Sequence, residues 1–71
     1  MNETTKAVLK DIFDDILEQL DEVKSDINDS HNRGRLLAYV DTLKTVRSYI
    51  DKDVWRDFGI DFDIDSKYLQ A

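Results

Sequence analysis

The sequence predicts an all-α protein: an antiparallel two-helix hairpin with a docked C-terminal tail, which dimerises into a four-helix bundle. Three observations predict this fold. Apolar side chains recur every three or four residues in two long stretches, which is the spacing of one buried helix face. A short polar segment separates the two stretches. The 71-residue chain has no proline and only two glycines, so little in it interrupts long helices.

The first helix is expected near residues 4–28. Thr4 or Thr5 is its expected N-cap, because both precede the apolar repeat and can accept hydrogen bonds from free N–H groups of the first turn. The residues of the buried stripe are spaced alternately by four and three positions: Leu9, Phe13, Ile16, Leu20, Val23 and Ile27. The opposite face is acidic, so we expect packing rather than charge to hold this helix.

A bend is expected at about residues 29–32. The segment from Asn28 to Arg33 loses the apolar spacing and collects residues that form turns and caps. Ser30 or Asn32 is the expected cap of the second helix. Gly34 fits either the end of the bend or the first helical turn, where its missing side chain would let the two helices approach closely. So short a connection makes the helices antiparallel neighbours.

The second helix is expected near residues 31–58. Its stripe consists of Leu36, Tyr39 or Val40, Leu43, Val46, Ile50, Val54 and Phe58. Gly59 is the expected left-handed residue that ends this helix. Ile60 would then contact Trp55, as in a Schellman motif.

The segment 60–71 is expected to be an extended tail. Apolar residues at 60, 62 and 64 alternate with Asp61, Asp63 and Asp65, a period that suits a strand, but a single short strand has nothing to pair with. We expect its apolar side chains to fold back over the hairpin near Trp55 and Phe58. Residues 1–71 therefore form a single helical-hairpin domain.

Small size makes self-association the expected source of further stability. A domain of this length buries only about 60% of the surface of its unfolded chain. There is no cysteine, so disulfides and thiolate metal sites are excluded. We therefore expect a homodimer. The candidate interface residues lie off the stripe that one partner helix would cover: Ile12, Leu17, Leu37, Val40 and Tyr49.

No pattern in the sequence indicates catalysis, so a non-enzymatic protein without a cofactor is predicted. His31 is the only histidine, and no glycine-rich motif for phosphate or for a serine nucleophile is present. Asp61, Asp63 and Asp65 have the spacing that opens a calcium loop, but Ser66 stands where that loop needs glycine and the closing glutamate is missing. Solvated carboxylates are favoured over a metal site, and whether they bind a cation is left open.

Charge separates the remaining functional hypotheses. Sixteen acidic and ten basic residues give a net charge of −6, which works against binding to nucleic acid or anionic membranes. Met1 is not followed by a leader-like apolar run, and a cytoplasmic location is expected. The leading hypothesis is a protein–protein interaction module or small regulator whose partner is unidentified. The alternative is an acidic nucleic-acid mimic that inhibits a DNA- or RNA-binding protein.

A third hypothesis, a DNA-binding helical dimer, depends on four cations: Arg33, Arg35, Lys44 and Arg47. Pairing of these side chains within the chain is favoured over phosphate contact, because the first helix is strongly acidic.

Part of the chain also resembles a known group of proteins. The run from Gly34 to Tyr39, with Leu43 four positions later, and the run from Phe58 to Asp61 resemble short uncharacterised helical proteins of Gram-positive bacteria and their phages or mobile elements. The resemblance covers residues 34–61 and consists mostly of core and cap residues. It implies a shared helical fold and no catalytic or ligand-binding residue.

Overall fold

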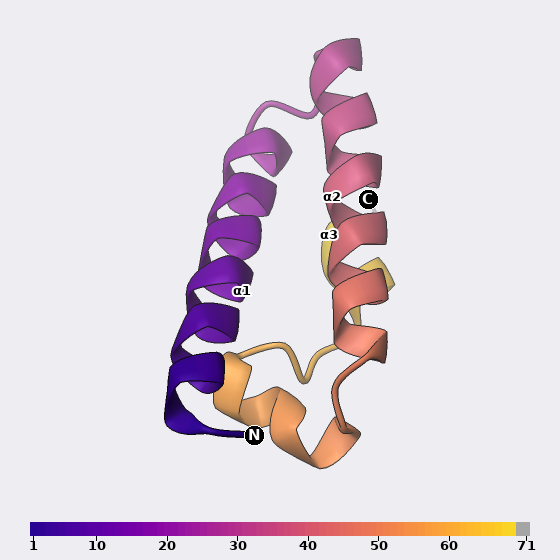
Figure 1. The fold of residues 1–71 in the computed structure, drawn as a ribbon. Helices are drawn as coiled ribbons and strands as arrows, with labels where there is room; N and C mark the ends of the chain where they lie inside the picture. The colour runs from indigo at the N-terminus through magenta and orange to yellow at the C-terminus, as the bar shows by residue number, and fades with distance from the viewer. Residues whose placement is uncertain (70–71) are drawn as a thin grey trace.

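The computed structural model describes residues 1–69, which form a hairpin of two long antiparallel helices closed by shorter elements (Figure 1). Helix α1 spans Glu3–Lys24 and α2 spans Ser30–Ser48. A 3-10 helix, η1, spans Lys52–Phe58, and a short helix, α3, spans Ile64–Tyr68. No strand occurs among residues 1–69, so the predicted all-α hairpin is confirmed.

Helix α1 differs from its prediction at both ends. Its N-cap is Asn2, not Thr4 or Thr5, and the Asn2 side-chain oxygen accepts a hydrogen bond from the Thr5 N–H at 2.7 Å. The helix ends at Lys24 rather than near residue 28, and residues 25–28 form turns. The predicted helix was too long because Ile27 continues the apolar spacing. Ile27 does pack against the core, but it does so from the turn after the helix.

The bend is capped by Asp29, not by Ser30 or Asn32. Its Oδ1 accepts the backbone N–H of His31 at 2.8 Å. Gly34 lies inside α2, and a Cβ added there would have no atom within 4 Å. The suggestion that Gly34 allows close helix approach is therefore wrong, because open space surrounds this position.

Helix α2 ends at Ser48, ten residues before the predicted end at 58. The reason is the length of its partner: 22 residues give α1 a length of about 33 Å. A helix continuing to residue 58 would extend about 15 Å past Ser48, beyond the N-terminal end of α1. Its last apolar residues would have nothing to pack against. The chain instead turns, and η1 crosses the open end of the hairpin (orange in Figure 1).

Packing and capping fix η1 in this position. The Phe58 ring lies 5.5 Å from the Phe13 ring, centre to centre, and the Trp55 indole donates a hydrogen bond to the Ile50 carbonyl at 2.9 Å. Gly59 has the predicted left-handed conformation, with φ 69°. The Ile60 N–H donates to the Trp55 carbonyl and the Gly59 N–H to the Arg56 carbonyl, which is the predicted Schellman pattern.

The tail docks on the hairpin, but it is not simply extended. Ile60 and Ile64 are fully buried, as the alternation predicted, and Tyr68 is buried as well. The tail includes α3, which begins at the cap residue Asp63 and packs against α2. Its Phe62 ring pairs edge-on with Tyr68 rather than with Trp55 or Phe58. Positions 70 and 71 of the predicted tail lie outside the described residues.

Every element contributes residues to the core. The residues of the predicted stripes belong to this core or pack against it. Val40, a candidate interface residue, is only 3% exposed and belongs to this core, so its assignment to a surface is wrong. The tail adds packing that a two-helix hairpin alone would lack, because α3 lies against α2. The buried residues are Phe13, Ile16, Leu20, Val23, Leu36, Val40, Leu43, Ile50, Phe58, Ile60, Ile64 and Tyr68.

Candidate functional site

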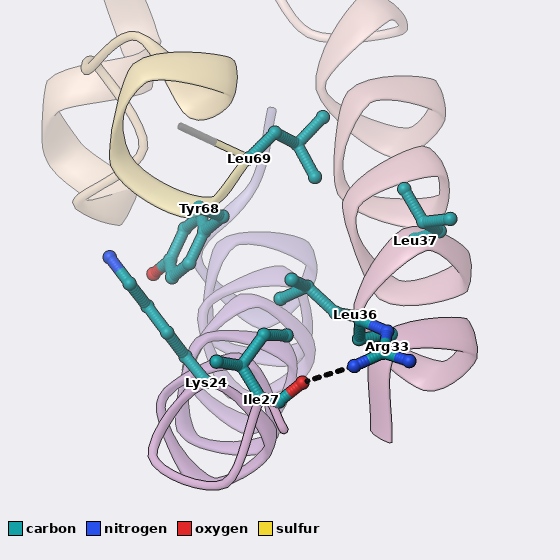
Figure 2. Close-up of a pocket in the computed structure, with 7 residues that line it drawn as sticks. All are labelled: Lys24, Ile27, Arg33, Leu36, Leu37, Tyr68 and Leu69. Carbon is teal, nitrogen blue, oxygen red and sulfur yellow. Dashed lines mark hydrogen bonds between the residues drawn. The ribbon is translucent and has the colours of Figure 1, made fainter. Parts of the chain in front are cut away.

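An apolar groove lies at the bend end of the molecule, where the end of α1, the start of α2 and the C-terminal residues of α3 meet (Figure 2). Its volume is about 490 Å³. The C-terminal segment is distant in the sequence from the other two segments, which the bend joins, so the groove exists only in the folded chain. The lining residues are Lys24, Ile27, Arg33, Leu36, Leu37, Tyr68 and Leu69.

The groove has a buried floor and an exposed apolar rim. Leu36 is buried, and Ile27 is partly buried against the core. In contrast, Leu37 is 59% exposed and Leu69 is 41% exposed. Large apolar side chains that remain this exposed beside a hollow are a feature of interaction surfaces.

Two cations stand at the groove, and each is anchored to a backbone carbonyl. Lys24 donates to the carbonyl of Lys67. Arg33 Nη1 donates to the carbonyls of Ile27 and Asn28 at 3.3 and 3.2 Å (Figure 2 marks the first). Of the residues that the structure describes, none that lines the groove carries a carboxylate.

Neither cation has a carboxylate partner in the part of the chain that the structure describes. Among residues 1–69, the ion pairs are Lys10 with Asp14 and Lys44 with Asp65. Lys24 and Arg33 are therefore not neutralised by an ion pair within residues 1–69, although Asp21 places a negative charge near Tyr68 of the groove wall.

Tyr68 forms part of the groove wall beside the Lys24 side chain (Figure 2), whose Nζ lies 5.7 Å from the ring centre. The Tyr68 hydroxyl is buried and has no hydrogen-bond partner among the described residues. Burial, together with the negative charge of Asp21, raises the pKa of Tyr68 to about 12. The neutral phenol is therefore the form that persists at physiological pH, with one unused O–H donor.

All four cations of the DNA-binding hypothesis make contacts within the chain. Arg33 donates to carbonyls of the turn that follows α1, as described above, and Arg35 Nη1 donates to Asn32 Oδ1 at 3.4 Å. Lys44 pairs with Asp65 of the tail at 2.5 Å. Arg47 donates to two tail carbonyls at 2.9 and 2.8 Å. Most of this positive charge therefore takes part in contacts that hold the bend and the tail.

The remaining candidate interface residues do not lie on a single surface. Leu37 borders the groove, whereas Tyr49 is 86% exposed and lines a second hollow of about 380 Å³ together with Met1. Leu17 is partly buried and packs against the core. Ile12 is 43% exposed on α1, one turn from the exposed Val8.

The three aspartates of the tail have separate structural roles or face solvent. Asp63 caps α3 by accepting the Ser66 N–H at 3.2 Å, and this hydrogen bond is the main cause that lowers the pKa of Asp63. Asp65 pairs with Lys44, and Asp61 is exposed. Within residues 1–69, no three acidic or histidine side chains are grouped as metal ligands would be.

Two groove residues were candidates from the sequence: Leu37 for an interface and Arg33 for DNA contact. The signal of Leu37 was an apolar side chain off the buried stripe, and that of Arg33 was its positive charge. Lys24, Tyr68 and Leu69 gave no such signal, because their relation to Leu37 depends on how the tail folds back. In the described part of the chain, no helix has both the length and the apolar character needed to cross a membrane.

Comparisons of this chain with protein-family models, curated proteins and solved structures gave no match. The resemblance over residues 34–61 therefore stays a prediction.

Proposed function

We propose that the protein is a non-enzymatic interaction module, a small regulator or adaptor that binds another protein through the groove between α1, α2 and α3. The observation that carries this proposal is the pair of exposed leucines, Leu37 and Leu69, beside an apolar hollow. Binding a partner would remove this apolar surface from water, at roughly 25 cal/mol for each Å² buried. The absence of cysteine favours a cytoplasmic setting for this module.

The test is affinity capture from a host lysate with two matched variants. Leu37→Gln removes an exposed apolar side chain from the groove, whereas Ile12→Gln removes one from α1. We expect wild type and Ile12→Gln to retain a common partner at both low and high salt, and Leu37→Gln to lose it. Equal retention of that partner by all three proteins would contradict a role for the groove.

A second candidate function is the acidic nucleic-acid mimic. The observation that favours it is the solvent-exposed acidic face of α1, formed by Asp11, Asp14, Asp15, Glu18, Asp21 and Glu22. Within the described residues, only Asp14 of this group belongs to an ion pair. A mimic would bind a basic protein in a salt-dependent manner, so its complex should weaken steeply as salt rises. A partner retained at high salt would argue against mimicry.

We also propose that two copies associate into a four-helix bundle. Support comes from Val8 and Ile12, which are 53% and 43% exposed one turn apart on α1. A dimer through this part of α1 would bring the long helices of two hairpins together. Sedimentation at micromolar concentration should then give a species of twice 8.3 kDa, and Ile12→Gln should shift it toward the monomer. A single 8.3 kDa species for wild type would refute the dimer.

A further inference from the structure

We propose that the groove binds an acidic amphipathic helix of a partner protein, with an apolar side chain in the hollow and carboxylates at Lys24 and Arg33. This inference rests on the proposed interaction function and specifies the chemistry of the partner. It concerns the side chains at the bend end of the molecule, which Figure 2 shows together.

The charged side chains at the groove indicate that the partner surface is acidic. Among residues 1–69, the lining contains two cations and no carboxylate, although the whole chain carries −6 and the charge of Asp21 reaches Tyr68. Lys24 and Arg33 are each held in place by backbone carbonyls, yet a lysine has three N–H donors and an arginine has five. Donors therefore remain at both side chains after their contacts within the chain are counted. Carboxylates are the protein groups that fit fixed cations with free donors.

The shape of the groove favours a helix over a small molecule. A small ligand is usually buried in a cavity over most of its surface. Here Leu37 and Leu69 remain largely exposed at the rim, and a molecule seated in the hollow alone would leave them in water. An amphipathic helix lays an apolar stripe across such a surface while its polar flanks reach the rim. A partner helix thus covers both leucines and reaches both cations.

A second copy of this chain fits the groove less well. Val8 and Ile12, beside the acidic side chains of Asp11 and Asp15, have suitable chemistry. However, Ile12 and Lys24 are about 120° apart around α1 at 3.6 residues per turn. A copy that inserts its Ile12 into a neighbour's groove would leave its own groove open. Contacts of this head-to-tail kind build rings or open filaments, not a closed dimer.

The test uses two synthetic helical peptides with the same leucine stripe, one with glutamate and the other with lysine at the polar positions. Each is titrated into the full-length protein labelled with ¹⁵N and followed by nuclear magnetic resonance. We expect the glutamate peptide to shift the amide signals of Ile27, Leu37 and Leu69, and to bind about tenfold tighter than the lysine peptide. Net charge alone predicts the opposite order, because the protein is acidic.

Matched variants locate the binding. Leu37→Gln should weaken binding of the glutamate peptide about tenfold, whereas Ile12→Gln should leave it unchanged. Lys24→Gln should weaken it about threefold, and Lys10→Gln, which removes the same charge elsewhere on α1, should have no effect. Circular dichroism and melting of each variant show that it is folded, so a change in affinity reports on the groove.

Three outcomes would overturn the proposal. Tighter binding of the lysine peptide at the groove would reverse the charge assignment while leaving the interaction function intact. Shifts from the glutamate peptide outside the groove, or equal effects of Lys24→Gln and Lys10→Gln, would place the site elsewhere. If neither peptide shifted groove signals, the acidic-helix partner would be rejected, and the lysate capture with Leu37→Gln would decide the interaction function separately.

Discussion

The guanidinium of Arg47 lies 4.2 Å from the centre of the Trp55 ring and also donates hydrogen bonds to the carbonyls of Ile60 and Phe62. One side chain of α2 thereby joins η1 to the tail. The planar guanidinium makes this possible, since its face stacks on the ring while its N–H groups point along the plane. Arg47 is partly buried, so its charge is better shielded from water than that of a surface cation.

Arg47→Lys is predicted to lower the free energy of unfolding by about 1–3 kcal/mol. A lysine has no planar face to stack on Trp55 and cannot bridge two carbonyls in the same geometry. Urea unfolding followed by circular dichroism measures the loss. Lys44→Gln is the matched control, since it removes a nearby cation whose ion pair with Asp65 is exposed and worth at most about 1 kcal/mol. A smaller loss for Arg47→Lys than for Lys44→Gln would contradict the bridging role.

The end of α2 shows what an apolar repeat does and does not predict. The stripe residues between Leu36 and Phe58 do face one core, as their spacing indicated. The spacing does not show that the backbone is one helix, because a turn followed by a 3-10 helix can bring Phe58 to the same core. Helix α2 ends where α1 no longer offers a surface to pack against. The position of this end therefore depends on packing between two helices, which the spacing within one of them does not show.

The tail shows a second limit of sequence reasoning. Alternating apolar residues correctly indicated that Ile60 and Ile64 are buried. The same alternation concealed α3, because Asp63 was counted as one of three acidic residues and not as a cap for the N–H of Ser66. A helix of five residues contains too few repeats for periodicity to detect. The groove was consequently beyond prediction, since α3 supplies one of its walls.

The two glycines are predicted to respond oppositely to alanine. Gly34 lies within α2 with open space around it, so Gly34→Ala should raise the free energy of unfolding by about 0.5–1 kcal/mol. Gly59 has a φ of 69°, where an L-residue is strained. Gly59→Ala should therefore lower the free energy of unfolding by about 1–2 kcal/mol. Parallel urea titrations compare the two variants. Destabilisation by Gly34→Ala would mean that a close neighbour does exist at that position.

Tyr68 is predicted to make stability sensitive to alkaline pH. Its pKa is raised from 10.0 to about 12, so the folded protein holds the phenol proton more tightly than the unfolded chain does. The associated stability is fully present below pH 10 and is lost as pH rises toward 12. Tyr68→Phe should reduce this loss, which is measured as the melting temperature of both proteins between pH 8 and pH 12.

Two comparisons separate this effect from general alkaline unfolding. Tyr49 is 86% exposed, so Tyr49→Phe should follow the wild-type curve. At neutral pH, Tyr68→Phe should be as stable as wild type or more stable by about 1 kcal/mol, because it removes a buried hydroxyl that has no partner among the described residues. A clear loss of stability at neutral pH would mean that the hydroxyl has an acceptor.

Asp63 is predicted to act as a helix cap and not as a calcium ligand. Asp63→Ala should lower the free energy of unfolding in the presence of EDTA, because the Ser66 N–H loses its acceptor. Asp63→Asn should cost little, since asparagine caps helices about as well as aspartate. Asp61→Ala, at an exposed position, is the control.

Calcium should leave the melting temperature of wild type nearly unchanged, because Asp65 is paired with Lys44 and the three carboxylates do not converge. A calcium-dependent rise of many degrees that Asp63→Asn abolishes would instead make residues 61–65 a metal site.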